Sequence, residues 1–213
     1  MSNNAPLVTI GILCFNAEAT ILNAIKSALS QTYKKKEIVL VDDCSTDNSL
    51  QVIRESEYIN HITLFHNKQN KGAAFSRNIV TQNSKGSFIC YMDDDDFSDR
   101  KRIEIQMKTI YDEGFKKNDC VLSICNIKRK YSSGYIKEMK VFGSEALKPN
   151  NSEMIDFLLF NEKNPTVDYG FGCPTCAMII SKKALEIVGG FDESLKRVED
   201  MDITIRLSKI GCN

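Results

Sequence analysis

Four consecutive aspartates, Asp93 to Asp96, follow directly after the apolar run 88–92. A run of this length that is rich in β-forming residues predicts a buried strand, so the carboxylates lie at its carboxyl end, where open α/β sheets bind ligands. Side chains two residues apart point the same way on a strand, so Asp93 and Asp95 can converge while Asp94 faces elsewhere. Such carboxylates repel one another unless a cation lies between them, and all-oxygen ligation suits Mg²⁺ or Mn²⁺. The alternative interpretation is a solvated acidic loop.

Two further acidic clusters lie at the ends of predicted elements. Asp42 and Asp43 end a strand-like run, and residues 199–202 (Glu-Asp-Met-Asp) follow the Gly-Gly-Phe-Asp segment at 189–192. Because the carboxyl ends of parallel strands meet at one edge of a sheet, Asp42 and the four aspartates can line the same crevice. An ionised aspartate can accept hydrogen bonds from a base N–H or a ribose hydroxyl. Helix capping is the alternative for both clusters, since carboxylates stabilise helix starts.

Composition narrows the class of protein. The chain has 213 residues, 42% of them hydrophobic, which is enough to bury the core of one domain. Lys plus Arg and Asp plus Glu both number 28, so the overall charge gives no case for a nucleic-acid partner. We see no signal peptide and no apolar stretch near the roughly 20 residues of a membrane span. We therefore expect a cytoplasmic protein, with the inner face of the cell membrane as an alternative location.

The eight cysteines fit a reducing compartment better than a disulfide framework. Cys173 and Cys176 have the spacing of a redox or zinc motif, but no second ligand pair accompanies them. We therefore expect reduced thiols without redox or metal function.

Strand and helix patterns alternate in the first half of the chain. Strands are expected over residues 8–15, 37–41, 61–65 and 87–92, with helices over 18–29, around 50–53, 72–81 and 101–111. This order predicts an α/β fold with a Rossmann-like, mostly parallel sheet and helices on both faces. In the second half we expect strands over 120–128, 135–141 and 176–180, a hairpin turn at 132–134, and helices over 152–160, 182–188 and 201–210.

The motifs resemble, in type and in order, those of family 2 inverting glycosyltransferases with the GT-A fold. The matching segments are 8–10 with 15–16, 27–33, 37–47, 70–72 with 76–78, the run from Asp93, 189–193 and 199–202. They extend over nearly the whole chain, from about residue 8 to about residue 207. The resemblance implies a single GT-A domain over residues 1–213. Its nucleotide-sugar-binding half would occupy about 7–115, and its smaller, mixed acceptor-side half about 116–213.

The resemblance implies roles on the donor side of the site. In such enzymes the end of the first strand and the Asp-Asp pair bind the base and the ribose, which implicates Phe15, by stacking, and Asp42. Asp94 is positioned for the ribose or the donor sugar. Lys71 and Arg77 are candidates for contacts to the diphosphate, with solvation at the surface as the alternative for both.

The resemblance also implies a metal and a base. The Asp-x-Asp motif corresponds to Asp93 and Asp95, which would hold Mn²⁺ or Mg²⁺ against the phosphates of a nucleoside-diphosphate sugar, with UDP as the expected nucleotide. Asp200 would be the general base that deprotonates the acceptor hydroxyl, so that attack inverts the anomeric carbon. The implied function is metal-dependent sugar transfer to a glycan or lipid-linked acceptor in surface-polysaccharide biosynthesis.

The sequence departs from the family pattern at three places. Four aspartates at 93–96 replace the commoner Asp-x-Asp-Asp, so Asp94 could also coordinate the metal. The first strand ends Leu13-Cys14-Phe15-Asn16, where many relatives carry a proline and a hydroxyl residue. The chain stops at Asn213, whereas relatives usually continue with elements that shape the acceptor site or contact the membrane. We therefore expect a shortened C-terminus, with any peripheral membrane association depending on the elements that are missing.

Three other classes compete with this interpretation. A nucleotidyltransferase would carry a Gly-rich, basic loop after its first strand, where this chain has residues 15–18, Phe-Asn-Ala-Glu. A signalling receiver domain would be shorter and would carry the Asp-Asp pair after its first strand rather than its second. A catalytically degenerate nucleotide-sugar-binding module would bind a donor without turnover.

Overall fold

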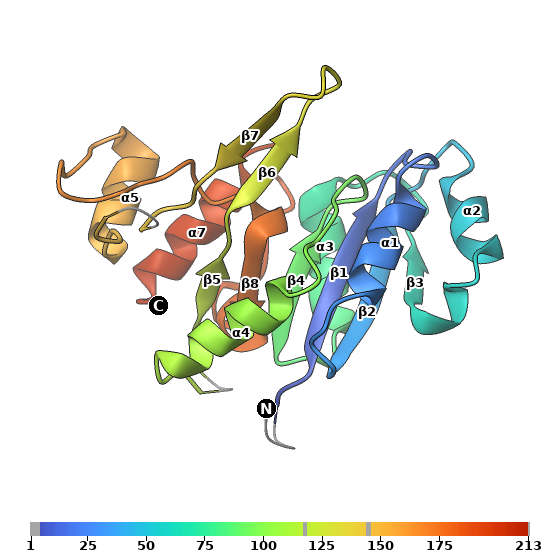
Figure 1. Cartoon of the computed structure of the whole chain (residues 1–213), viewed down its shortest axis with the longest axis horizontal. Helices are drawn as coiled ribbons and strands as arrows, with labels where there is room; N and C mark the ends of the chain where they lie inside the picture. The colour runs from blue at the N-terminus through green and yellow to red at the C-terminus, as the bar shows by residue number, and fades with distance from the viewer. Residues whose placement is uncertain (1–4, 117–118, 144–145, 213) are drawn as a thin grey trace.

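A computed structural model of the chain describes residues 5–116, 119–143 and 146–212 (Figure 1). Its strands are β1 (Val8–Cys14), β2 (Lys36–Asp42), β3 (Thr63–His66), β4 (Phe88–Met92), β5 (Leu122–Ile124), β6 (Ile127–Lys130), β7 (Ile136–Met139) and β8 (Met178–Ser181). Its α-helices are α1 (Ile21–Leu29), α2 (Ser49–Glu55), α3 (Ala73–Asn83), α4 (Arg102–Asp112), α5 (Asn151–Phe160), α6 (Lys182–Val188) and α7 (Glu199–Lys209). Two short 3₁₀ helices are η1 (Ile59–His61) and η2 (Thr175–Ala177).

The central sheet has six strands in the order β3-β2-β1-β4-β8-β5. The first four strands are mutually parallel, while β8 runs antiparallel to both β4 and β5. This arrangement confirms the predicted mostly parallel sheet. Strands from both predicted halves of the chain belong to this one sheet, and the division into halves stays a prediction.

The central strands are buried on both faces. Every residue of β1 and β4 is buried, as expected for parallel strands covered by helices above and below. Continuous apolar runs, rather than alternating ones, therefore identified these strands in the sequence.

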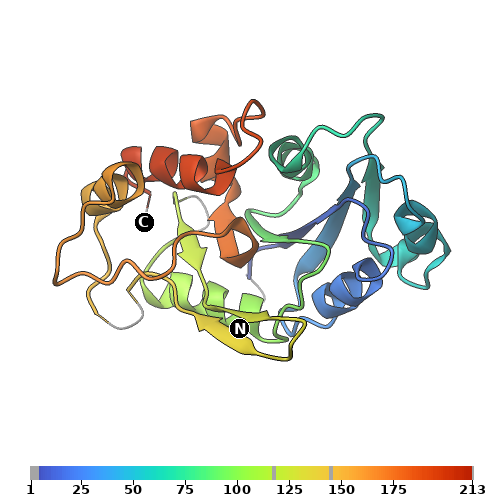
Figure 2. The same cartoon turned by 90° about the horizontal axis from the view of Figure 1, so that it is seen from above.

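Helices form a layer on each face of the sheet (Figure 2). On one face Ile25 of α1 and Met107 of α4 belong to one buried cluster. On the other, Val80 of α3 packs in a second cluster with residues of α6 and α7. Helix α3 lies so close to β1 that a Cβ on Gly11 would come within 2.5 Å of Val80 Cγ1. Glycine at this position thus lets the helix that carries Arg77 pack tightly on the sheet.

The second half of the chain corrects two sequence predictions. One strand was expected over residues 120–128, but the chain changes partner there: β5 pairs with β8, whereas β6 pairs with β7 in a separate two-stranded sheet. The strand expected from residue 176 begins at Met178, because residues 175–177 form η2. The predicted hairpin turn is confirmed, with the Gly134 amide donating to the Tyr131 carbonyl at 2.9 Å.

None of the helices in the described ranges combines the length and apolar composition needed to cross a membrane.

Asn78 on α3 ties this helix to the loop that follows α6. Its amide donates to the Phe191 carbonyl (2.9 Å) and to Glu193 Oε1 (2.8 Å), and its Oδ1 accepts from the Phe191 amide (2.8 Å). Asn78 is buried, so Asn78→Ala should lower the free energy of unfolding by about 3 kcal/mol, since buried backbone groups lose their partners. Urea denaturation measures this loss.

Asn83→Ala on the same helix is the matched control. Asn83 is exposed and donates only to the Ile79 carbonyl of its own helix, so its loss should cost no more than about 0.5 kcal/mol. Equal losses in the two variants would contradict the bridging role of Asn78.

Candidate functional site

The four aspartates form a tight turn instead of extending the strand. Strand β4 ends at Met92, and the Asp96 amide donates to the Asp93 carbonyl at 3.3 Å. In return, the Asp93 amide donates to Asp96 Oδ2 at 3.1 Å. Strand alternation therefore does not apply beyond Met92, and the reason for expecting Asp93 and Asp95 to converge is lost. The turn brings Asp93 and Asp96 together, while Asp95 is exposed.

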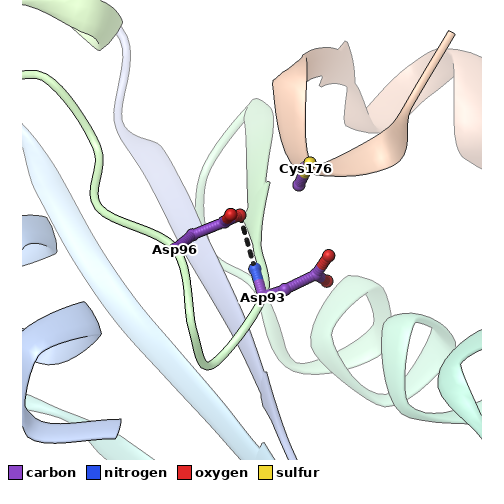
Figure 3. Close-up of side chains that lie close together, drawn as sticks. All are labelled: Asp93, Asp96 and Cys176. Carbon is purple, nitrogen blue, oxygen red and sulfur yellow. Dashed lines mark hydrogen bonds between the residues drawn. The ribbon is translucent and has the colours of Figure 1, made fainter. Parts of the chain in front are cut away.

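Cys176 joins the carboxylates of the turn (Figure 3). One ligand atom each from Asp93, Asp96 and Cys176 lies within 4.8 Å of the others. Burial raises the pKa of Cys176 to about 12, and nearby Asp96 and Asp93 add to the effect. Burial likewise raises the pKa of Cys173 to about 12. Both thiols thus stay protonated at neutral pH, which is poor chemistry for the redox or zinc motif that their spacing suggested.

The carboxylates of the turn destabilise one another's ionised forms. Burial raises the pKa of Asp93 to about 6; Arg77 opposes this shift, and Asp96 and Asp95 add to it. Burial also raises the pKa of Asp94 and of Asp96. A divalent cation would relieve this repulsion, and carboxylate oxygens are the ligands that Mn²⁺ and Mg²⁺ prefer. The carboxylate oxygens of the turn are therefore suitable ligands for such an ion. The protonated thiol of Cys176, which lies beside them, is a poor ligand.

The end of β1 is fastened to the acidic turn. Asp94 Oδ2 accepts a hydrogen bond from the Phe15 amide at 2.8 Å. The next residue, Asn16, has a positive φ of 52°, and its side chain accepts from the Thr46 amide at 2.7 Å. Phe15 itself is 46% exposed, so its ring is not part of the core. An exposed aromatic ring beside carboxylates is available to stack on a planar ligand.

Asp42 and Asp43, at the end of β2, have different surroundings. Asp42 is fully buried, and its Oδ2 lies 2.8 Å from His66 Nδ1, whereas its Oδ1 has no hydrogen-bond partner among the described residues. Asp43 accepts from the backbone amides of Lys71 (3.0 Å) and Gly72 (2.7 Å). Asp43 thus holds the loop before α3, and the exposed side chain of Lys71 projects from that loop. Asp42 is left with an unused acceptor.

Arg77 is buried between two of the acidic clusters. Its Nη1 lies 2.7 Å from Glu199 Oε1, its Nη2 lies 3.7 Å from Asp93 Oδ1, and its guanidinium lies 5.5 Å from the centroid of the Phe191 ring. Its side chain is only 7% exposed, so surface solvation does not describe it. The sequence did not reveal this bridge or the role of Glu199. A signal was present, because Arg77 lies three residues from the buried Val80 and Ala74 on the inward face of α3.

Asp200 lies at the start of α7 beside a cavity. The cavity has a volume of about 430 Å³, and its lining includes Phe157, Phe171, Pro174 and Met201 as well as Asp200. Burial raises the pKa of Asp200, while a hydrogen bond from the Met201 amide and the charge of Arg77 oppose the shift. A carboxylate with a raised pKa is a better proton acceptor near neutral pH. The site therefore combines an acidic donor-side edge with a candidate base at an open, largely apolar cavity.

The structure brings together most of the residues predicted from the sequence. Phe15 is bonded to Asp94, and Arg77 joins Asp93 to the start of α7, next to Asp200. Asp42 ends β2, Lys71 lies on the loop after β3, and Asp95 lies on the turn after β4. Within the described ranges, no hydrogen bond or ion pair joins their side chains to the other predicted residues. The assignment of Asp93 and Asp95 as metal ligands stays a prediction.

The fold and its acidic edge define an α/β protein of the type that binds ligands at the carboxyl ends of parallel strands. A family model described as Glycosyl transferase family 2 matches residues 9–187. The chain belongs to this family, which confirms the membership predicted from its motifs.

Individual relatives agree with the family assignment. The chain is 41% identical, over 43% of its length and 36% of the relative, to UDP-Glc:alpha-D-GlcNAc-diphosphoundecaprenol beta-1,3-glucosyltransferase WfaP of Escherichia coli. It is 30% identical to chondroitin synthase of Escherichia coli, over 97% of the chain and 27% of the relative. The chain therefore spans well under half the length of these curated relatives.

Solved structures confirm the fold. Staphylococcus aureus TarS 1-349 in complex with UDP-GlcNAc matches with a TM-score of 0.68 and 21% identity, covering 95% of this chain and 53% of that one. Mannosyltransferase PcManGT from Pyrobaculum calidifontis, in complex with GDP-Man and Mn²⁺, matches with a TM-score of 0.66 and 17% identity, covering 99% and 54%. The predicted GT-A fold is thereby confirmed.

Arg77→Met tests the bridge between the acidic clusters. The variant leaves Glu199 and Asp93 without their cation, so the free energy of unfolding should fall by about 3 kcal/mol. The pKa of Asp93 should rise further above about 6, because the charge that now lowers it is removed. Denaturation and carboxyl NMR titration measure the two effects.

Lys108→Met is the control, because Lys108 forms an exposed ion pair with Asp112 on α4. This change should cost less than about 1 kcal/mol. An unchanged pKa of Asp93 in Arg77→Met would contradict the proposed coupling.

Proposed function

We propose that the chain is the catalytic domain of an inverting glycosyltransferase. It would transfer a sugar from a nucleoside-diphosphate sugar, with UDP as the nucleotide, to a hydroxyl of a glycan or lipid-linked acceptor in polysaccharide biosynthesis. The observation that carries the proposal is a chain of contacts. Phe15 bonds to Asp94 of the 93–96 turn, and Arg77 joins that turn to the start of α7, where Asp200 lines an open cavity. The WfaP relative, named for a UDP-Glc donor and a diphosphoundecaprenol-linked acceptor, supports this choice of substrates.

The donor nucleotide would bind where β1 and β2 end. Asp42 Oδ1, which has no partner among the described residues, would accept a hydrogen bond from the base or ribose. Phe15 would stack on the base with its exposed ring. Asp94, already fixed by the Phe15 amide, would face the ribose or the sugar. Lys71, exposed on the adjoining loop, would contact the diphosphate. Arg77 would act there through Asp93, which it holds, rather than as a free surface cation.

Asp93 and Asp95 would hold a divalent cation, Mn²⁺ or Mg²⁺. Such an ion neutralises the charge that develops on the departing diphosphate. The solved PcManGT structure, whose name includes Mn²⁺, supports a divalent metal. The chemistry of the turn supports the same choice, because its carboxylates are crowded and burial raises the pKa of Asp93, Asp94 and Asp96.

Asp200 would take the proton from the acceptor hydroxyl. The acceptor oxygen then bonds to the anomeric carbon from the side opposite the diphosphate, the bond from that carbon to the diphosphate oxygen breaks, and the configuration inverts. The raised pKa of Asp200 suits this task. The apolar walls of the cavity beside it suit the less polar faces of a sugar ring.

Asp95→Ala tests the metal assignment. If Asp95 is a ligand, isothermal calorimetry should show that Mn²⁺ no longer strengthens UDP binding, a loss of at least about tenfold in affinity, or about 1.4 kcal/mol. The control is Asp112→Ala, which removes an exposed carboxylate from the far end of α4. Unchanged Mn²⁺-dependent affinity in Asp95→Ala would remove Asp95 from the metal site.

Asp200→Asn tests the base. Donor affinity should stay within about twofold, whereas transfer to a diphosphoundecaprenol-linked sugar should fall by about 10²–10⁴-fold, the usual contribution of a general base. Release of UDP and formation of the glycosylated product are measured together for a panel of UDP-sugars.

Asp202→Asn is the matched control in the same helix, because Asp202 pairs with Arg206 at 2.5 Å instead of lining the cavity. It should retain transfer. Near-normal transfer by Asp200→Asn would mean that another group is the base, and donor binding without turnover by the unaltered chain would leave only a binding module.

A further inference from the structure

The β6–β7 hairpin stands apart from the central sheet and projects beyond the body of the molecule (Figure 1). Its root is anchored: Met139 is 5% exposed, and the Val141 amide donates to Asn126 Oδ1 at 3.0 Å. Beyond the root the hairpin is solvated on both faces, and every residue from Lys128 to Glu138 is exposed. A segment that is firmly held at one end and solvated along its length presents its side chains to something outside the chain.

Basic side chains surround the shaft of the hairpin. Lys128, Arg129, Lys130 and Lys137 lie on its two strands, with Glu138 as the single acidic residue. Cross-strand pairing places Lys128 opposite Glu138, so this basic residue is compensated. The chain as a whole has no formal net charge, so the positive charge of the hairpin is a local feature.

Arg129 and Lys137 occupy directly opposite positions in the two strands. Like charges at such positions destabilise a β-ribbon, and among the described residues no carboxylate pairs with either side chain. The repulsion between Arg129 and Lys137 is therefore uncompensated at an exposed position of the hairpin. An anionic ligand bound between the two side chains would remove this repulsion.

The tip of the hairpin is aromatic and apolar. Tyr131 and Tyr135 form a ring pair with centroids 5.7 Å apart, and Ile136 follows directly. Their exposures are 41% for Tyr131, 62% for Tyr135 and 54% for Ile136. Tyrosine rings with an apolar body and a polar hydroxyl favour the boundary between water and lipid.

We propose that the β6–β7 hairpin docks the protein onto an anionic phospholipid surface. The tip side chains enter the headgroup region, and the basic residues of the shaft contact lipid phosphates. Each Lys or Arg near such a surface contributes about 1 kcal/mol, and buried apolar area adds to this binding.

The distribution of side chains favours a lipid surface over a soluble anionic glycan. Lys130 and Arg129 are adjacent in one strand and so point to opposite faces of the ribbon, which puts charge all around the shaft. A planar layer of phosphates can contact both faces once the tip has entered it. A single glycan chain would be recognised on one face and by hydrogen-bond acceptors as well as donors. Glu138 is the only carboxylate on the two strands, and it already lies opposite Lys128.

The hairpin points toward the same end of the molecule as the carboxyl ends of the parallel strands (Figure 1). Docking through its tip would thus turn the acidic edge toward the membrane. The proposal does not rest on the transfer reaction, since it concerns only the hairpin and lipid.

Vesicle flotation with the full chain tests the proposal. The protein should bind vesicles of phosphatidylcholine mixed with phosphatidylglycerol, should not bind phosphatidylcholine alone, and should be released by high salt. The double variant Arg129→Ser and Lys137→Ser should bind about 30-fold more weakly, which corresponds to about 2 kcal/mol for two basic residues. Removing two exposed basic residues elsewhere, with Lys183→Ser and Lys209→Ser on α6 and α7, should leave binding within about twofold.

The tip has its own matched pair of variants. Tyr131→Ser should weaken vesicle binding at least fivefold, whereas Tyr111→Ser, which removes an equally exposed (41%) tyrosine from α4, should not. Three results would overturn the proposal: no binding to anionic vesicles, equal binding by the hairpin variants, or binding to a soluble anionic polysaccharide without binding to vesicles. Asp95→Ala should bind vesicles normally, so failure of the donor site and failure of membrane docking can be told apart.

Discussion

The buried guanidinium of Arg77 needs carboxylates close to it, and much of the site follows from that requirement. A desolvated charge without partners would cost several kcal/mol, so Glu199 at the start of α7 and Asp93 at the end of β4 must stay near α3. The Phe191 ring, whose centroid lies 5.5 Å from the guanidinium, completes the surroundings of the charge. Tyr91 packs edge-to-face against this ring, with the two centroids 5.5 Å apart. One cation therefore fixes the distance between the acidic turn and the helix that carries Asp200. The ion pairs of Arg77 thus contribute to the stability of the fold and also set the geometry of the site.

The sequence predicted the sheet because its central strands are buried on both faces. β1, β2 and β4 read as continuous apolar runs separated by helical periodicity, and these local signals are sufficient for a parallel α/β arrangement. The orientation of β8 and the split between β5 and β6 depend on which strand each segment pairs with. No local pattern records that choice, so these elements were predicted with wrong boundaries.

The candidate site was predictable in its membership and less so in its geometry. Acidic residues after apolar runs indicated one edge of the sheet, and Asp94, Asp42 and Asp200 lie at element ends as expected. The turn that pairs Asp93 with Asp96 was not foreseen, because it depends on one backbone reversal directly after β4. The burial of Arg77 was missed for a similar reason. The spacing of Arg77 from Ala74 and Val80 indicated its inward face, but the carboxylates that compensate its charge come from distant segments that no local pattern identifies.

If Asp42 binds the donor as proposed, its Oδ1 would give the edge of the sheet a means of rejecting wrong ligands. Folding has already removed this oxygen from water without giving it a partner among the described residues. A ligand that donates to it relieves an existing deficit, whereas one that lacks the donor leaves the deficit in place. Discrimination then follows the cost of an unsatisfied buried acceptor, about 1–3 kcal/mol, and exceeds that of an exchangeable surface contact. Selectivity at this position would then be set by the penalty for a mismatch more than by the strength of a match.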